Sequence, residues 1–461
     1  MNNEFDGFHD VRNNNDLMIL ILDVDRYNVW LSNDAQDFER KYLQTIQYNP
    51  NTKTPLFIPS LSGGVQRILF PIDKNDYWAL SSLYDFLPSG SYDLCDHHSI
   101  ITSELFYISF GLGFYQFDRY KQVNKKSVSL FLPDKYKSII EYINAHCWVR
   151  NLINTPAEDM GPQELAHELK CLATKFMGTY SEIVGASLLS ENYPAIHAVG
   201  RASNRSPRLA ELTWGDVAHP VVSLVGKGVC FDSGGLDIKS ASGMLIMHKD
   251  MGGAAHVLGL AYLIMSYNLP IRLRVLIPCV ENLINEDSIK PSDVITMRNG
   301  LTVQVKNTDA EGRLILADAL YKAHTESPDL IIDFATLTGA MRVALGTDIP
   351  GFFSTNKQMA LDLQEISGLV GDLVWNMPLF SGYNSDILGG ISNYSNVSDS
   401  GFGGAITAAL FLQKFVGNSE WIHFDLMAWN HKSRPGRPVG GEAMGLIAIT
   451  TYLKQRYSRK S

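Results

Sequence analysis

The sequence has few cysteines and no long run of apolar residues. The cysteines stand singly, without a Cys-x-x-Cys pair, at Cys95, Cys147, Cys171, Cys230 and Cys279. An odd number of scattered cysteines predicts reduced intracellular thiols and argues against a disulfide framework or a cysteine-based zinc site. Apolar runs such as Leu17–Leu22 are strand-sized, far below the roughly 18–20 residues that cross a bilayer. The N-terminus is polar and acidic, so we expect no secretion, no membrane association and a cytoplasmic location.

Basic residues are also fewer than acidic residues. The chain has 39 Lys and Arg against 48 Asp and Glu, a formal net charge of −9. An acidic chain without a Lys- and Arg-rich run suits a phosphate backbone poorly, so nucleic acid is not an expected partner. Hydrophobic residues make up 45% of the 461 residues and charged residues 19%, which predicts a folded protein with a large core. At roughly 150 residues per domain, the length allows two or three domains.

The first third of the chain alternates short apolar runs with polar turns. We predict strands at Leu17–Leu22, Val65–Phe70 and Ser127–Leu132. A helical pattern over Tyr136–Leu152 meets a proline at Pro156, which ends it, and a second, amphipathic helix opens at Pro162. We place the domain boundary near residues 150–160, with a smaller N-terminal α/β domain at 1–150 and a larger C-terminal α/β domain at 151–461.

The second half alternates strands and helices more regularly. Strands are predicted at Val221–Val225, Ile271–Val280, Leu330–Ile332 and Trp421–Leu426, and helices at Ala254–Tyr267, Leu314–Ala323 and Ala405–Val416. Such alternation is typical of a mostly parallel central sheet flanked by helices. In such a sheet, ligands bind at the carboxyl ends of the strands.

Three glycine-rich segments at these strand or helix edges carry acids and bases. They are Gly226–Lys239, His248–Ala254 and Asn307–Leu314. A single Asp beside Gly is most often a turn or a helix cap. Four acids at one sheet edge would repel one another, and divalent cations would relieve that repulsion. These acids are Asp232, Asp250, Asp309 and Glu311.

Other readings of these segments fail on their spacing. A phosphate loop at Gly226-Lys227 would need Gly at the position of Val221 and Ser or Thr at that of Gly228. Phe231 stands where a dinucleotide fingerprint needs its third Gly and where a nucleophile elbow around Ser233 needs its first. The pair His167-Glu168 lacks the second His of a zinc helix.

The motifs resemble those of the leucyl aminopeptidase, or cytosol aminopeptidase, family. The octapeptide NTDAEGRL stands intact at Asn307–Leu314, and the block GKG-[IV]-x-FDSGG matches Gly226–Gly235, with Ile238-Lys239 following. The block KDMGGAA matches Lys249–Ala255, and the segment from Asn154 to Ala157 resembles the entry to the family's catalytic domain. The resemblance runs from about residue 148 to the C-terminus. It implies that residues 151–461 form a catalytic metallopeptidase domain.

The resemblance implies an aminopeptidase with two divalent metal ions, Mn²⁺ or Zn²⁺, with Mg²⁺ as a third candidate. Asp232 and Glu311 would bridge both ions, Asp309 would complete one site, and Asp250 with Lys227 would complete the other. A metal-bridging hydroxide would attack the peptide bond. Lysine binds a metal only when neutral, and two neighbouring dications would disfavour its ammonium form.

The resemblance also assigns roles around the metals. Lys239 would hold the substrate carbonyl oxygen and the developing oxyanion, and Arg313 would hold a bicarbonate-like anion that relays a proton. Gly312 and Leu337 would lie beside that anion. The pocket for the first side chain, with leucine and other apolar residues preferred, would be lined by Met247, Thr336 and Gly339; plain core packing is an equal reading for Met247.

The expected substrates are peptides with a free N-terminus, and the expected assembly is a homohexamer. A nucleic-acid-binding regulator and a non-catalytic oligomer are the alternatives. Two features depart from the common family pattern. Cys230 stands where Thr is common, and either tunes metal choice and redox sensitivity or acts as a small buried hydrophobe. The stretches Phe424–Asn430 and Arg434–Pro438 resemble only one branch of the family.

Overall fold

The computed structural model describes residues 5–13, 15–96, 100–101 and 103–458. By its internal contacts the chain divides into two compact units. The N-terminal unit comprises Met1–Cys147 together with Lys432–Pro438, and the C-terminal unit comprises Trp148–His431 and Val439–Ser461. A short segment far along the chain therefore packs with the first third of the sequence.

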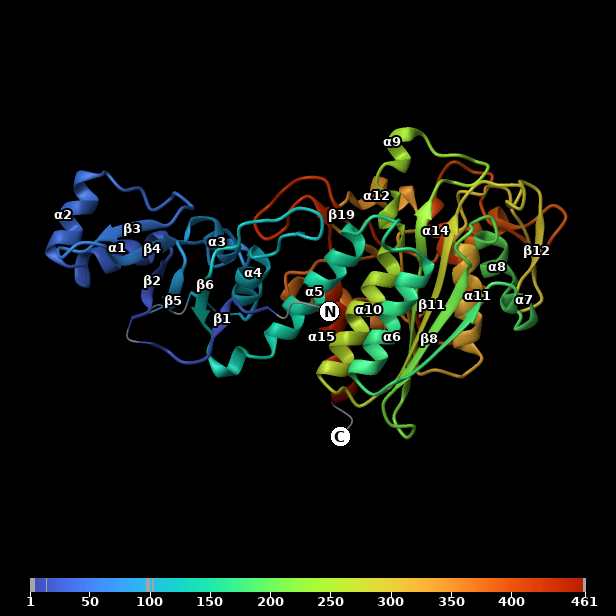
Figure 1. Ribbon diagram of the computed structural model, residues 1–461, viewed down its shortest axis with the longest axis horizontal. Coiled ribbons are helices and arrows are strands. Elements are labelled where there is room, and N and C mark those ends of the chain that lie inside the picture. The colour runs from blue at the N-terminus through green and yellow to red at the C-terminus, as the bar shows by residue number, and fades with distance from the viewer. Residues whose placement is uncertain (1–4, 14, 97–99, 102, 459–461) are drawn as a thin grey trace. The chain divides into compact units, whose positions relative to one another are not determined.

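The N-terminal unit is built on a six-stranded sheet in the order β1-β6-β5-β2-β4-β3 (Figure 1). The pairs along this order are parallel except β4 with β3. The strands are β1 (Phe8–His9), β2 (Leu17–Leu22), β3 (Leu56–Pro59), β4 (Val65–Pro71), β5 (Gly90–Cys95) and β6 (Val128–Phe131). The helices are α1 (Val24–Asn33), α2 (Asp37–Thr45), α3 (Leu83–Phe86) and α4 (Leu105–Gly113), with 3-10 turns η1 (Ala79–Ser82) and η2 (Asp134–Tyr136). The three strands predicted here are present, with ends that differ by at most a residue.

Apolar composition explains how this unit is held together. Helix α4 has the sequence LFYISFGLG and is buried along nearly its whole length, so it is a core helix rather than an amphipathic cover. On β2, Ile19 to Leu22 are all buried, as expected of a central parallel strand that is covered on both faces. Helix α5 (Ile139–Asn154) follows η2 and leads into the C-terminal unit.

The C-terminal unit contains a nine-stranded sheet in the order β16-β15-β18-β14-β9-β11-β8-β7, with β10 also paired to β11. Its strands are β7 (Thr179–Val184), β8 (Arg208–Trp214), β9 (Val221–Gly226), β10 (Gly228–Asp232), β11 (Arg272–Asn282), β14 (Leu330–Ala335), β15 (Gly351–Ser354), β16 (Trp375–Asn376) and β18 (Trp421–Asp425). The central pairs are parallel, whereas β8 runs antiparallel to β11, β7 to β8, and β15 to β18. The mixed α/β class with a mostly parallel central sheet is confirmed.

Helices cover both faces of this sheet (Figure 1). One layer contains α6 (Pro162–Lys175), α10 (Gly252–Ser266) and α15 (Leu446–Ser458), and the other contains α8 (Pro194–Gly200), α11 (Gly312–His324) and α14 (Gly404–Gln413). Helix α6 buries Leu165, Leu169 and Leu172, the apolar stripe that its sequence predicts. The remaining helices are α7 (Ser187–Ser190), α9 (Ala241–Met244), α12 (Gly339–Leu345) and α13 (Lys357–Leu369), with 3-10 turns η3 (Met247–Met251) and η4 (Ser381–Ile387). Small sheets join β12 (Val294–Thr296), β13 (Thr302–Gln304) and β17 (Tyr394–Ser395), and β19 (Trp429–Asn430) with β20 (Gly440–Gly441).

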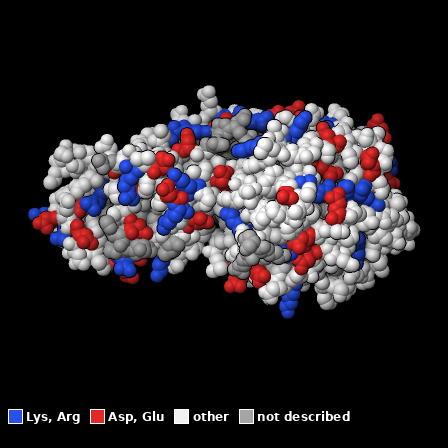
Figure 2. Space-filling view, turned by 90° about the horizontal axis from the view of Figure 1, so that it is seen from below, with Lys and Arg blue, Asp and Glu red and all other residues white. Residues whose placement is uncertain are grey.

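Three features of the described residues concern membrane spans, thiols and surface charge. Among the described residues, no helix is both long and apolar enough to cross a bilayer. All five cysteines are free thiols. On the face drawn in Figure 2, basic and acidic side chains are interspersed rather than separated by sign. That face offers no broad basic surface of the kind that binds a phosphate backbone.

Buried Asp318 on α11 supports the start of α8. Its carboxylate accepts hydrogen bonds from the backbone N–H groups of Ala195 and Ile196, at 2.8 and 3.4 Å, and of Arg298, at 3.1 Å. We expect Asp318→Ala to lower the free energy of unfolding by about 2–4 kcal/mol, because it leaves buried donors without acceptors. Asp318→Asn keeps one acceptor oxygen and should lower the free energy of unfolding by a smaller amount. Chemical denaturation of the two variants measures both effects.

The same side chain predicts a pH dependence. Burial raises the pKa of Asp318 from 3.8 to about 7. The folded state therefore keeps the proton over a range in which the unfolded state has released it, so the contribution of Asp318 to stability falls as pH rises through about 7. The stability of the wild type relative to Asp318→Asn should decrease as the pH rises from about 4 to about 7, and it should change little above that. A constant difference would contradict this.

Candidate active site

The three segments singled out in the sequence meet at the carboxyl edge of the central sheet. Strands β9 and β10 pair with successive parts of β11, and Lys227, which lies between them, interrupts this pairing. The backbone N–H of Lys227 donates to Phe334 on β14 instead, at 3.0 Å. After this interruption, β10 leads to Asp232 at its end. Asp250 lies on η3, and Glu311 lies in the turn before α11.

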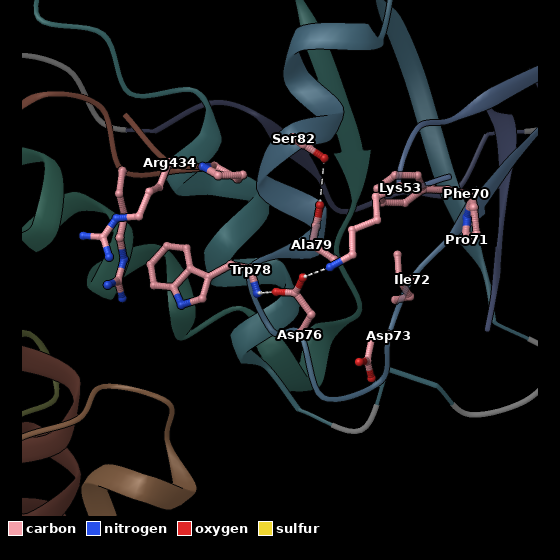
Figure 3. Close-up of a pocket in the computed structure, with 12 residues that line it drawn as sticks. Lys53, Phe70, Pro71, Ile72, Asp73, Asp76, Trp78, Ala79, Ser82 and Arg434 are labelled. Atoms are coloured by element: carbon pink, nitrogen blue, oxygen red, sulfur yellow. Dashed lines mark hydrogen bonds and ion pairs between the residues drawn. The ribbon is translucent and has the colours of Figure 1, made fainter. Parts of the chain in front are cut away.

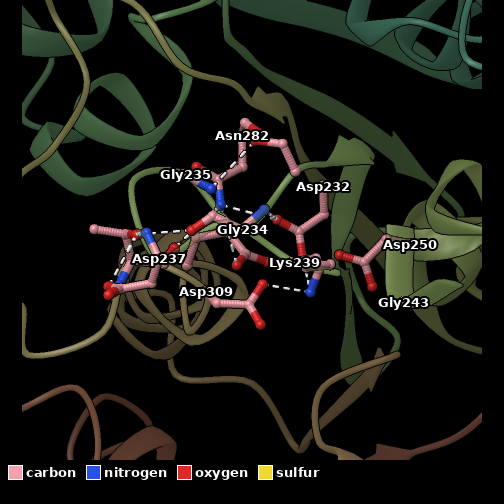
Figure 4. A network of polar contacts seen from close by, with 12 residues as sticks. Asp232, Gly234, Gly235, Asp237, Lys239, Gly243, Asp250, Asn282 and Asp309 are labelled. Atoms are coloured by element: carbon pink, nitrogen blue, oxygen red, sulfur yellow. Dashed lines mark hydrogen bonds and ion pairs between the residues drawn. The ribbon is translucent and has the colours of Figure 1, made fainter. Parts of the chain in front are cut away.

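Four carboxylates and two ammonium groups form one cluster. Figure 4 shows part of it, with Asp232, Asp309 and Lys239 close together. Oxygen atoms of Asp232, Asp309 and Glu311 lie within 4.8 Å of one another. Lys227 Nζ lies 2.7 Å from Asp250 Oδ2 and 3.1 Å from Glu311 Oε1. Lys239 Nζ lies 2.8 Å from Asp232 Oδ2 and also contacts Asp309. The structure thus brings together all four acids that the sequence singled out.

The two lysines differ in their access to solvent. The side chain of Lys227 is 4% exposed, whereas that of Lys239 is 17% exposed at the rim of the cluster. Gly312 makes the position of Lys227 possible, because a Cβ at residue 312 would lie 2.5 Å from Lys227 Cε. Lys227 Nζ also donates to the carbonyl oxygen of Thr336 at 3.1 Å.

The charges in the cluster do not balance. Burial and the carboxylate of Asp232 raise the pKa of Glu311 to about 7, and they raise the pKa of Asp309 to about 6. Burial lowers the pKa of Lys227, but the surrounding carboxylates outweigh it and the net shift is upward. Burial also lowers the pKa of Lys239, but the carboxylates of Asp232 and Asp309 outweigh burial and the net shift is upward. With four acids against two ammonium groups, further positive charge would stabilise the cluster.

Asn282, at the end of β11, is a site residue that the sequence did not reveal. Its Nδ2 donates to Asp232 Oδ1 at 2.8 Å and to the carbonyl oxygen of Thr308 at 3.1 Å. Gly234, with φ of +89°, donates its N–H to the same Asp232 oxygen at 2.9 Å. A single Asn at a strand end has no motif, so only the fold shows that it orients Asp232 (Figure 4).

Asp237 and Thr308 join the two loops of the cluster. The N–H of Thr308 donates to Asp237 Oδ2 at 2.7 Å, and the N–H of Asp237 donates to Thr308 Oγ1 at 2.8 Å. These reciprocal bonds hold the loop that carries Lys239 against the turn that carries Asp309 (Figure 4). They were not predicted, because the partners lie 71 residues apart.

Arg313, the second residue of α11, is buried. Its Nη1 donates to the carbonyl oxygen of Asn396 at 2.6 Å, and its Nε has no hydrogen-bond partner among the residues that the structure describes. Burial lowers the pKa of Arg313 to about 10, so the side chain stays a cation at neutral pH. A buried cation with an unused donor can receive an anion.

The loop after β14 carries the other predicted site residues. Thr336 is buried, and its Oγ1 donates to Asp250 Oδ1 at 2.7 Å. The N–H of Leu337 donates to Asp425 Oδ1 at 3.0 Å, and Thr338 Oγ1 donates to Asp425 Oδ2 at 2.5 Å. Asp425, at the end of β18, therefore fixes this loop. The sequence did not reveal this role of Asp425.

The predicted pocket residues and Cys230 have different surroundings. Met247 begins η3 and is half-buried, and Gly339 begins α12 and is exposed. Cys230 is fully buried on β10, and burial raises its pKa well above the usual range, so it is a protonated thiol. These are the surroundings of the small buried hydrophobe that was one of its two readings.

The fold and this cluster are those of a metallo-exopeptidase, a hydrolase. Residues 147–450 match the catalytic domain of the cytosol aminopeptidase family, and residues 18–133 match the M17 aminopeptidase N-terminal domain. The chain belongs to the cytosol aminopeptidase family. The family resemblance drawn from the motifs is thus confirmed.

Relatives and solved structures agree with this assignment. Peptidase B of Yersinia pestis strain Pestoides F is 38% identical over 317 residues, which cover 66% of this chain and 73% of that protein. The crystal structure of cytosol aminopeptidase from Coxiella burnetii is 44% identical, with a TM-score of 0.94 over 98% of this chain and 99% of that one. The bottromycin maturation enzyme BotP in complex with Mn is 26% identical, with a TM-score of 0.85 over 96% and 99% of the two chains.

Proposed function

We propose that this protein removes the N-terminal residue from peptides at a two-metal site held by the clustered side chains. The observation that carries the proposal is the excess of negative charge in the cluster, four carboxylates against two ammonium groups. Asp232 and Glu311 would bridge the ions, Asp309 would complete one site, and Asp250 with Lys227 the other. We assign the catalytic domain to residues 151–461 and the N-terminal domain to residues 1–150.

The donor set fits divalent cations. Carboxylate oxygens suit Mn²⁺, Zn²⁺ and Mg²⁺, and BotP, a structural relative, has been solved with Mn. The Lys227 side chain is 4% exposed and contacts Asp250 and Glu311, and this burial among carboxylates supports a role as a metal ligand. When bound, such ions supply an activated water and polarise the scissile carbonyl group.

The chain's own residues would perform the remaining steps. Lys239 lies at the exposed rim, so its ammonium can donate a hydrogen bond to the substrate carbonyl oxygen as negative charge develops there. Arg313 would hold a bicarbonate-like anion through its unused Nε donor, and that anion would accept the proton of the attacking water. Gly312 would flank this anion, and Leu337 would do so through its side chain, since its N–H is bonded to Asp425.

Met247, Thr336 and Gly339 would line the pocket for the first side chain. We propose that this pocket prefers leucine and other apolar residues. Capture of the free α-amino group at the site would confine cleavage to the first residue. We also propose a cytoplasmic location, in line with the acidic chain and its free thiols.

Metal analysis combined with a substrate panel tests the function. We expect two divalent ions per chain, loss of activity after chelation, and recovery on adding Mn²⁺ or Zn²⁺. Leucyl-amide substrates should be cleaved, and their N-acetylated counterparts, which lack the free amine, should not. Equal cleavage of both substrates, or full activity of the metal-free protein, would refute the proposal.

Arg313 makes a separate prediction about the anion. Arg313→Ala should lower the rate and abolish its increase with added bicarbonate, because the anion has lost its cationic partner. Metal content should stay at the wild-type level, since Arg313 contacts none of the four carboxylates in the structure's hydrogen bonds and ion pairs. The measurement titrates bicarbonate after carbonate has been removed, with chloride at equal ionic strength as the control. A variant activated as fully as the wild type would disprove this role.

Assembly is a further prediction, which rests on the family alone. We propose that the protein forms a homohexamer. Light scattering at micromolar concentration should give six times the mass of one chain. A stable monomer with full activity would contradict it.

A further inference from the structure

The N-terminal unit contains a pocket of about 440 Å³ at the carboxyl end of β4 (Figure 3). Phe70, at the end of this strand, and Ile72, just after it, form part of the wall, and Trp78 on the following loop forms another part. In parallel sheets this edge is the usual place for a ligand. The pocket belongs to the unit that the proposed catalytic residues do not use.

A tight turn from far along the chain closes the pocket. Arg434 and Arg437 exchange two backbone hydrogen bonds, each of 2.8 Å, across Pro435 and Gly436. Gly436 has φ of +65°, which suits the third position of such a turn. The sequence marked this stretch as typical of only one family branch, and the proposed peptidase reaction gives it no role.

The turn presents two guanidinium groups to the same place. Residues that exchange both hydrogen bonds lie opposite each other, so their side chains emerge on one face. The side chains of Arg434 and Arg437 both line the pocket, and Arg437 Cζ lies 3.9 Å from the centre of the Trp78 ring. Gly436 holds the turn against η1, because a Cβ there would lie 2.9 Å from Ser81 Cβ and 3.2 Å from the Trp78 ring.

The charged side chains that line the pocket determine which ligand charge it can bind. Lys53 Nζ lies 3.5 Å from Asp76 Oδ2, and Asp73 adds a second carboxylate to the lining (Figure 3). With the two arginines, the lining has three cations and two anions, a formal charge of +1. A single negative charge is therefore favoured, and a polyphosphate would be repelled by the two acids.

We propose that this pocket binds a small monocarboxylate with an apolar side group. The carboxylate would lie on the Arg434–Arg437 turn, where guanidinium groups match its two oxygens, and the side group would pack against the Trp78 ring. This binding does not depend on the proposed peptidase activity, since none of its residues belongs to the metal cluster.

Three probes test this on the complete wild-type chain by calorimetry. We expect 3-phenylpropanoate to bind at least about tenfold more tightly than 3-phenylpropanamide, which has the same shape without the charge. It should also bind more tightly than propanoate, which lacks the ring. Equal binding of the acid and its amide would overturn the proposal without any variant being made.

Variants locate the binding. Arg434→Gln should weaken 3-phenylpropanoate at least about tenfold and leave the amide unchanged. Arg40→Gln, which removes an arginine of the same unit outside the pocket lining, and Arg313→Ala in the C-terminal unit should bind the acid as the wild type does. Loss of binding in Arg313→Ala but not in Arg434→Gln would place the acid at the proposed catalytic site and refute this pocket.

Discussion

Glu311→Gln should leave a folded protein that has lost most of its bound metal and its activity. Glu311 is 2% exposed, and it lies within reach of Asp232, Asp309 and Lys227 at the centre of the cluster. The amide keeps the volume but removes the charge that would bridge both ions. We expect kcat/KM to fall by roughly 10³-fold or more, equivalent to about 4 kcal/mol of transition-state stabilisation.

The test measures metal content and peptide hydrolysis on the same preparation. Asp318→Asn is the matched control, because it neutralises another buried carboxylate on the helix that Glu311 precedes. The control should lose stability yet keep its two metals and its turnover. A Glu311→Gln enzyme with two metals per chain and a near-normal rate would show that the bridging assignment is wrong.

Local sequence patterns account for the central architecture. β2 is a continuous apolar run, β9 and β11 are predominantly apolar, and α6 is amphipathic, so periodicity and composition indicate each of them. The antiparallel edges are different. β7 pairs with β8, and β8 pairs with β11 over residues as far apart as Arg208 and Cys279, and their own residues do not encode that choice. The prediction of a mostly parallel sheet was right for its centre and could not specify its edges.

The site divides in the same way. The acids and lysines of the cluster stand in glycine-rich motifs, and those motifs are visible in the sequence alone. Their supports, Asn282, Asp425 and Asn396, are single polar residues at strand ends or in loops, and each acts on a partner at least 50 residues away. Single polar residues of this kind are common in any sequence, so only the fold separates them from surface residues. The packing of Lys432–Pro438 with the N-terminal unit was hidden for the same reason.

Lys239→Ala should lower kcat strongly while the metals stay bound. The ammonium lies at the exposed rim of the cluster, where the proposed oxyanion would form, and it would act mainly in the transition state. Removal of one oxyanion donor predicts a loss of about 10²–10³-fold in kcat, with a smaller change in KM.

The metal content of the Lys239→Ala variant distinguishes an oxyanion-binding role of Lys239 from a role as a metal ligand. Lys239 contacts Asp232 and Asp309, so its removal takes a positive charge away from two carboxylates and should strengthen their attraction for a divalent ion. Lys306→Ala is the matched control, because Lys306 is close to the site in sequence but pairs with the exposed Asp399 at 2.7 Å. The control should keep its kcat. If metal content fell together with kcat in Lys239→Ala, the lysine would support the metals rather than the substrate, and the oxyanion role would be refuted.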